Sequence, residues 1–283
     1  MSGKINHPVD DLSYQKAFFI DMDGVINKGF TLIPGAREFV DRLRAGNHKF
    51  LFITNNSYYT AAELREKYAS IGIEADENSF FTSAMSTANF LENQSYGCSA
   101  YVIGGKGLKQ ELESAGVRIT KEKPDYVIVG ETEEYDYTSI IEATFLIQEG
   151  AKFLATNQDI TGPTPRGLVP ACGALVAPIE RVTGVKAYFL GKPNPVMMYW
   201  ARKKIKAHSR NSFMIGDRMD TDIVGGLEAG MTTCLVLSGV TSRNGVKRFP
   251  YQPDYLFDSV SVIDPDRILS RWDRLRTGKE HNR

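Results

Sequence analysis

Two aspartates stand one residue apart at the end of a short apolar run near the N-terminus. Apolar residues occupy 17–20, and Asp21, Asp23 and Gly24 follow them. A short apolar run that stops at polar and glycine positions is typical of a buried strand. Because side chains alternate along a strand, the two carboxyl groups point the same way, with α-carbons roughly 6–7 Å apart. Such a pair repels itself, so a cation, a shared proton or hydrogen bonds must compensate the charge.

Three further polar clusters follow apolar runs in the same manner. They are Thr54-Asn55-Asn56 after 50–53, Lys192 after 188–190, and Asp217 with Asp222 after 213–215. Each cluster alone is a weak signal, since paired acids arise by chance and Thr-Asn-Asn is usually a turn. Parallel sheets bind ligands at the carboxyl ends of their strands. If the four strands share one sheet, the four clusters therefore share one ligand-binding edge.

Strands and helices alternate along the whole chain. Apolar runs predict strands near 17–20, 50–53, 101–103, 126–129, 153–155, 188–190, 213–215, 233–237 and 255–257. Helical spacing and capping residues predict helices near 34–46, 60–71, 83–94, 106–115, 137–148, 173–183, 195–207, 222–229 and 265–276. This order indicates an α/β fold with a parallel sheet that helices cover on both faces. We interpret 83–187 as a separate α/β unit, which leaves 1–82 and 188–283 as the core domain.

Two segments are predicted to lack regular structure. Residues 1–15 are expected to form a loose tail. The segment 156–170 contains several glycines and prolines and is predicted to be a long loop. Loops of that length are more often functional than incidental.

Composition excludes several classes of protein. Lys with Arg and Asp with Glu both number 34, so no nucleic-acid polymer is expected as a partner. No apolar run approaches the roughly 18–20 residues of a membrane span, so no membrane partner is expected. The N-terminus also lacks the apolar core of a signal peptide. Cys98, Cys172 and Cys234 form neither a metal-binding pattern nor a disulfide framework, which makes a cytoplasmic location the simplest expectation.

The four polar clusters resemble, in order, the four motifs of the haloacid dehalogenase superfamily. The matching stretches are Asp21-Met22-Asp23-Gly24-Val25, Thr54-Asn55-Asn56, Lys192, and Gly216-Asp217 with Thr221-Asp222. Stretches at 129–132, 155–157, 170–174 and 191–193 are similar to subclass IIA, which holds the p-nitrophenyl-phosphatase-like enzymes and the phosphatase of the bacterial N-acetylglucosamine operon. The resemblance runs from about 18 to 237. It implies a Rossmann-like core with an α/β cap domain, concerned with substrate specificity, inserted between the second and third motifs.

The function that the resemblance implies is a Mg²⁺-dependent phosphatase. Its substrates would be small phosphate monoesters such as nucleotide, sugar or p-nitrophenyl phosphates. Asp21 would be the nucleophile, forming an aspartyl-phosphate that water then hydrolyses. Asp23 would protonate the leaving oxygen and then remove a proton from the attacking water. The alternative for both residues is a solvated turn after a strand.

Magnesium prefers carboxylate and carbonyl oxygens. The resemblance implies a metal site of Asp21, Asp23, Asp217 and Asp222, in which Asp23 contributes its backbone carbonyl. Asp222 is expected to brace the ligands or Lys192 rather than to bind directly. An ordinary acid at a helix N-terminus is an equal alternative for it.

The remaining motif residues suit phosphate binding. The hydroxyl of Thr54, the backbone N–H of Asn55 and the charge of Lys192 would bind the phosphoryl oxygens. Asn56 is expected to hold the loop. Asn157, Asp159 and Arg166 would hang over the active site and read the leaving group, with an ordinary surface loop as the alternative. The physiological metabolite is left open, and a homodimer through the cap is expected from relatives.

Two other functions suit the same residues. A phosphorylation-switched receiver-like protein also uses clustered acids, a threonine and a lysine at the edge of a parallel sheet. It needs neither Asp23 nor an insertion of about a hundred residues. A phosphotransferase would share the chemistry up to the aspartyl-phosphate.

Overall fold

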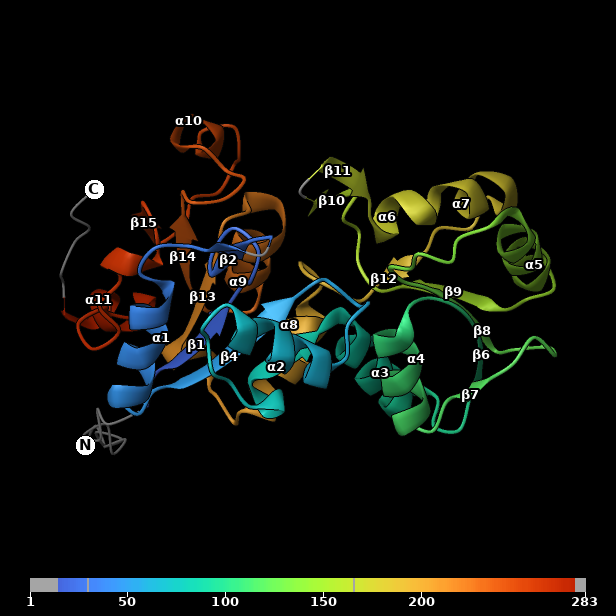
Figure 1. Cartoon of the computed structure of the whole chain (residues 1–283), viewed down its shortest axis with the longest axis horizontal. Helices are drawn as coiled ribbons and strands as arrows, with labels where there is room; N and C mark the ends of the chain where they lie inside the picture. The colour runs from blue at the N-terminus through green and yellow to red at the C-terminus, as the bar shows by residue number, and fades with distance from the viewer. Residues whose placement is uncertain (1–14, 30, 165, 278–283) are drawn as a thin grey trace, which may run out of the picture.

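The computed structural model describes residues 15–29, 31–164 and 166–277 (Figure 1). The predicted loose tail lies outside these residues except for Gln15. Two parallel sheets, each covered by helices, occupy the two halves of the molecule (Figure 1). Within the described residues, no helix has both the length and the apolar character that crossing a bilayer requires.

The first sheet has six parallel strands in the order β15-β14-β13-β1-β4-β5. In chain order these are β1 (Ala17–Ile20), β4 (Lys49–Thr54), β5 (Phe80–Thr82), β13 (Ser212–Gly216), β14 (Thr232–Val236) and β15 (Tyr255–Phe257). The central strand β1 is buried along its whole length, as its unbroken apolar sequence predicts. It pairs with β13 on one side and β4 on the other. The order β13-β1-β4 in the sheet therefore places three of the predicted polar clusters after neighbouring strands.

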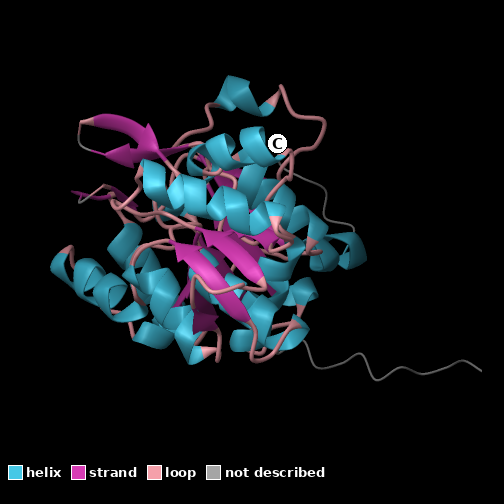
Figure 2. Ribbon diagram, turned by 90° about the vertical axis from the view of Figure 1, so that its right-hand side faces the viewer, coloured by secondary structure: helices cyan, strands magenta, loops and turns pink. Residues whose placement is uncertain are grey.

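Helices pack on both faces of this sheet. Figure 2, seen from the side of the second sheet, shows helices on both sides of the strands at its centre. Phe18 and Ile20 point to one face and pack with apolar residues of α1 (Ala36–Ala45) and α2 (Ala61–Ser70). Phe19 points to the other face and packs with α8 (Pro195–Lys204). The remaining elements of this half are β2 (Asn27–Lys28), β3 (Thr31–Leu32), α9 (Val224–Glu228), α10 (Arg243–Val246) and α11 (Arg271–Thr277).

The second sheet has five parallel strands in the order β12-β9-β8-β6-β7. They are β6 (Ser99–Ile103), β7 (Arg118–Ile119), β8 (Tyr126–Val129), β9 (Lys152–Ala155) and β12 (Tyr188–Phe189). Helices α3 (Ser83–Gln94) and α4 (Lys106–Ser114) share an apolar cluster with one face. Helices α5 (Tyr137–Gln148), α6 (Cys172–Leu175) and α7 (Ala177–Thr183) pack on the other. We call this sheet, α4–α7 and the segments that connect them, including 156–171, the cap, because they are inserted between α3 and α8.

Most predicted strands and helices are confirmed, but several details differ. The predicted loop 156–170 contains an antiparallel hairpin, β10 (Thr161–Thr164) with β11 (Gly167–Pro170). The single helix expected over 173–183 is divided into α6 and α7. Strand β5 precedes α3 and was not predicted. The strand at 188–189, which the predicted division assigns to the core, is hydrogen bonded to β9 in the cap.

The last helix begins at Arg271 rather than near 265. The side chain of Asp264 accepts hydrogen bonds from the backbone N–H groups of Asp266 and Arg267, which holds this segment in a turn. The hydroxyl of Ser270 accepts from the backbone N–H of Asp273 at 3.1 Å and so caps the helix that follows.

Candidate active site

The polar residues that follow β1, β4 and β13 meet at one edge of the core sheet. Ile20 pairs with Ile215 on one side and Phe52 on the other, so the three strands end within two residues of the same level. Oxygen atoms of Asp21, Asp217 and Asp222 lie within 4.8 Å of one another. The predicted convergence of these acids is therefore present in the structure.

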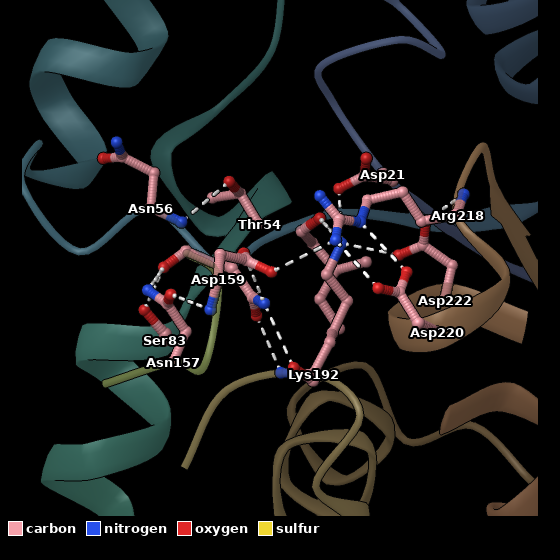
Figure 3. Close-up of polar contacts among 12 residues, drawn as sticks. Asp21, Thr54, Asn56, Ser83, Asn157, Asp159, Lys192, Arg218, Asp220 and Asp222 are labelled. Carbon is pink, nitrogen blue, oxygen red and sulfur yellow. Dashed lines mark hydrogen bonds and ion pairs between the residues drawn. The ribbon is translucent and has the colours of Figure 1, made fainter. Parts of the chain in front are cut away.

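Lys192 is the positive charge at the centre of this cluster (Figure 3). Its side chain is buried, and Nζ forms ion pairs with Asp21 and, at 2.8 Å, with Asp222. Burial lowers the pKa of Lys192, but the carboxylates of Asp21 and Asp222 outweigh this effect, so the net pKa is raised and the lysine stays charged. Burial raises the pKa of Asp21 well above its usual value, an effect that Lys192 opposes.

The two carboxylate oxygens of Asp217 differ in their hydrogen bonding. Its Oδ2 accepts from the backbone N–H of Val240 at 2.6 Å. Its Oδ1 is buried and has no hydrogen-bond partner in the part of the chain that the structure describes. Burial raises the pKa of Asp217 to about 7, and the charge of Asp222 adds to the shift. A buried carboxylate oxygen without a donor is suited to a cation.

Asp222 is held by its own loop. It lies in the π-helical turn Met219–Ile223, and its Oδ2 accepts from the backbone N–H of Arg218 at 3.1 Å. Its Oδ1 faces Lys192 at 2.8 Å. This arrangement suits the bracing role expected for Asp222, although the residue also belongs to the cluster of acids that could hold a metal. Asp220 points elsewhere and pairs with Arg218 at 2.9 Å.

Asp23 differs from the other acids in being exposed. Its Oδ1 accepts from the side-chain amide of Asn27 at 2.8 Å, and the amide oxygen of Asn27 accepts from the hydroxyl of Tyr68. Protein atoms surround the carboxyl group closely enough that lost solvation raises the pKa of Asp23. A carboxyl group that is accessible and holds its proton more tightly than free Asp suits proton exchange with a bound molecule.

The loop after β4 carries the expected phosphate-binding groups. Thr54 is buried, and its Oγ1 accepts from the backbone N–H of Asn56 at 3.1 Å, which leaves the hydroxyl hydrogen available for donation. The side-chain oxygen of Asn56 accepts from the backbone N–H of Tyr58 at 3.0 Å. The structure therefore shows Asn56 holding the loop, as expected. Asn55 is buried and contacts both Lys192 and the cap.

Two of the three cap residues predicted near the site reach it. The amide of Asn157 contacts the backbone oxygen of Asn55 at 2.7 Å, and Asp159 contacts the side chain of Asn55 at 2.9 Å (Figure 3). Asp159 also lies 4.0 Å from Arg218. Arg166 instead occupies the exposed turn between β10 and β11.

The sequence analysis assigned no role to four residues that support the site, although one of them, Glu131, lies in the stretch 129–132 that resembles subclass IIA. Ser57, Ser83, Glu131 and Arg218 each contact a motif residue or the cap segment next to it. Glu131 follows the apolar strand β8 almost directly, which is the same strand-end signal that identified the other clusters. Arg218 stands two residues after β13 and Ser83 directly follows β5, so both carry this signal too, although β5 was not predicted. Ser57 carries no such signal, because its partner Glu131 is distant in sequence.

A parallel α/β sheet with three of the clusters at one edge, an inserted α/β cap, and Lys192 reaching those clusters from the segment after the cap strand β12 together define a haloacid dehalogenase-like hydrolase. Family models agree. Residues 18–118 match the model described as haloacid dehalogenase-like hydrolase, and residues 189–263 match a related HAD-hydrolase-like model.

Individual relatives cover most of the chain. A dihydroxyacetone phosphatase from Corynebacterium glutamicum is 42% identical over 87% of this chain and 90% of its own length. The ribonucleotide monophosphatase NagD from Escherichia coli is 40% identical over 88% of this chain and 98% of its own length. The NagD structure superposes with a TM-score of 0.84, covering 89% of this chain and 99% of that one.

A glycerol phosphate phosphatase from Mycobacterium tuberculosis, solved in complex with magnesium, is 30% identical with a TM-score of 0.82. It covers 87% of this chain and 75% of that one. The chain belongs to subclass IIA of the haloacid dehalogenase superfamily. It is a hydrolase that acts on small phosphate monoesters, which leaves the receiver-like alternative without support.

Proposed function

We propose that this phosphatase requires Mg²⁺ and works through an aspartyl-phosphate on Asp21. The observation that carries the proposal is the buried pair of Asp21 and Lys192 next to the orphaned oxygen of Asp217. A carboxylate between a fixed cation and a buried oxygen that lacks a donor can approach a phosphate dianion, which otherwise repels it.

The residues present fit a magnesium ion. Asp21 and Asp217 would bind it by their side chains and Asp23 by its backbone carbonyl, while Asp222 would brace Lys192. Three buried carboxylates within 4.8 Å carry more negative charge than one lysine balances. A bound Mg²⁺ supplies the charge that neutralises the phosphate and the carboxylates around it. The magnesium-containing structure of a relative supports this choice of cation.

The chain's own groups divide the reaction into two steps. The Asp21 carboxylate attacks phosphorus, and the ester oxygen leaves with a proton from Asp23. The Asp23 carboxylate then accepts a proton from a water molecule, whose oxygen attacks phosphorus and releases Asp21 and inorganic phosphate. Thr54, Asn55 and Lys192 would hold the phosphoryl oxygens through both steps.

The cap would select among small phosphorylated metabolites. Asp159 lies against the site and would meet the leaving group of a bound ester, whereas Arg166, in the exposed turn of the hairpin that starts two residues later, would meet it only if the hairpin moved toward the site. A homodimer through the cap and a cytoplasmic location complete the proposal, on the basis of the family resemblance and the cysteine pattern.

The test is release of inorganic phosphate from p-nitrophenyl phosphate with and without Mg²⁺, with Asp21→Asn as the control. We expect activity that EDTA abolishes and added Mg²⁺ restores, and none in the variant. Brief exposure to a ³²P-labelled ester should label the wild type at Asp21. Activity that survives EDTA, or that survives Asp21→Asn, would refute the proposal. Transfer of phosphate to an added alcohol in preference to water would favour a phosphotransferase.

A further inference from the structure

One carbonyl group of the loop after β4, which the proposed function makes the phosphate-binding loop, receives hydrogen bonds from two other elements. The backbone oxygen of Asn55 accepts from the side-chain amide of Asn157 at 2.7 Å and from the hydroxyl of Ser83. Both donors have no solvent exposure. A buried carbonyl with two donors from separate elements has a fixed orientation, because turning it would leave all three groups unpaired.

The side chain of Asn55 is fixed as firmly. Its Oδ1 accepts from the backbone N–H of Lys192 at 2.7 Å. Its amide donates to Asp159 at 2.9 Å and to the backbone oxygen of Lys192 at 3.1 Å. Of the polar groups of Asn55, the backbone N–H is the one without an acceptor among the residues that the structure describes. That N–H is the group which the proposed function assigns to the phosphate.

Asn157 is itself oriented so that it presents a donor to this carbonyl. Its amide nitrogen also donates to Glu131 at 2.5 Å, and its oxygen accepts from the backbone N–H of Asp159 at 3.0 Å. The second oxygen of Glu131 accepts from the backbone N–H of Ser57 at 3.0 Å, so the carboxylate cannot turn away. A flipped amide would place its oxygen against both a carboxylate and a carbonyl.

We propose that Asn157 is a positioning residue for phosphate binding. Through Asn157 the cap fixes the orientation of the phosphate-binding loop, whichever ester is bound. The inference rests on the proposed function, because it takes the N–H of Asn55 as a phosphate donor. Within the phosphate-binding loop Asn157 contacts the backbone of Asn55, which every phosphoryl group would meet, and its other partners, Glu131 and Asp159, belong to the cap. Loss of the Asn157 donor should therefore lower kcat/KM by the same factor for all phosphate esters. Loss of a specificity residue would instead change the ratios of kcat/KM among the esters.

The test compares the wild type with Asn157→Asp, which preserves shape and the contact to Asp159 but removes the donor. The measurements are kcat and KM for three chemically different esters, the inhibition constant of inorganic phosphate, and the melting temperature. Because a small displacement of a reacting group is costly, we expect kcat/KM to fall about 10- to 100-fold for all three esters. Inhibition by inorganic phosphate should weaken as well. Asn93→Asp is the matched control, since the Asn93 amide also donates to a backbone oxygen, at 2.8 Å, but on the exposed side of α3.

A double variant separates positioning from simple attachment of the cap. In Glu131→Gln with Asn157→Asp, the new amide donates to the new carboxylate, so the contact between the two positions is restored with its direction reversed. The carbonyl of Asn55 still faces an oxygen. We expect the melting temperature to recover while phosphate binding and kcat/KM stay low. Recovery of activity in the double variant would overturn the inference.

Ser83→Ala gives a second, milder test of the same carbonyl. It should lower kcat/KM equally for all esters, by less than Asn157→Asp does. Unchanged phosphate inhibition in Asn157→Asp, unequal effects among esters, or an unaffected Ser83→Ala variant would each refute the inference. If the proposed function is wrong, the wild type itself lacks Mg²⁺-dependent phosphatase activity. If only this inference is wrong, the wild type is active and the variants give one of the three results just named.

Discussion

Asp217 occupies a position that only glycine neighbours permit. A β-carbon on Gly24 would lie 2.5 Å from Oδ2 of Asp217, and one on Gly239 would lie 2.0 Å from it. Gly24 also has a φ of +85°, which side-chain-bearing residues rarely adopt. The glycine that follows the two aspartates is therefore required by the acid at 217 as well as by its own turn.

Replacing Gly24 should disturb the metal site and not only the backbone. We expect Gly24→Ala to push Asp217 aside and to raise, at least severalfold, the Mg²⁺ concentration that gives half-maximal activity. Gly29→Ala is the control, because Gly29 has a φ of +60° but no atom within 4 Å of an added β-carbon. Both variants should lose about 1 kcal/mol of unfolding free energy from the positive φ. A Mg²⁺ titration that matches for the two variants would contradict the assignment of Asp217 to the metal.

The raised pKa of Asp217 predicts how the metal-free protein responds to pH. Burial raises this pKa to about 7 in the folded state, above the usual value of 3.8 that applies when unfolded. Between these values the folded chain holds more protons than the unfolded chain, so the free energy of unfolding falls as pH rises from about 4 to about 7. Above that range the contribution of Asp217 is constant.

Denaturant unfolding in EDTA at pH 5 and pH 7.5 measures this dependence. Asp217→Asn should reduce the loss of stability between the two pH values, since the amide does not titrate. Added Mg²⁺ should stabilise the wild type more at pH 7.5, because the cation competes with protons for the carboxylates. An identical pH dependence in wild type and variant would show that Asp217 does not contribute.

Among the secondary-structure elements, apolar strands and capped helices were predictable. The capping box at Thr60 and Glu63 is present at the start of α2, and unbroken apolar runs form the buried strands β1, β8 and β13. The hairpin β10–β11 was not predictable, because its glycines and prolines are typical of loops and all four β11 residues are exposed. Short exposed strands lack the alternating pattern that reveals a half-buried strand.

The hairpin carries apolar side chains on its surface, which suits contact with a leaving group. Leu168 is 73% exposed, and Ile160, just before the hairpin, is 62% exposed. We expect Leu168→Ser to raise KM for p-nitrophenyl phosphate severalfold and to leave glycerol phosphate within about twofold, since only the aromatic leaving group gains from apolar contact. Val262→Ser, at a residue 59% exposed elsewhere on the surface, is the control. Equal effects on both esters would exclude the hairpin from substrate selection.

The molecule as a whole buries its three cysteines in separate places. Cys98, Cys172 and Cys234 are buried and unpaired, and they belong to three different apolar clusters. Burial raises the pKa of Cys172 to about 12 and raises the pKa of the other two thiols as well. Thiols that are both inaccessible and protonated react slowly, since the thiolate is the nucleophile.

A thiol reagent at pH 8 should therefore label none of the three cysteines within minutes in the folded protein. In guanidinium chloride all three should react at once, and a reductant should not change the melting temperature. Rapid labelling of a single cysteine in the native state would identify a region that opens locally.

The sequence by itself determined the alternation of strands and helices and the candidates for the chemistry. Those features depend on local spacing: a buried strand must be apolar, and the residue after it must be polar if it faces a ligand. The pairing of each acid with its partner was decided only by the tertiary structure. Lys192 meets Asp21 across 171 positions of sequence, and Asn157 meets Asn55 across 102. Contacts of this kind depend on how the two sheets pack together, and the local spacing of residues along the chain does not predict that packing.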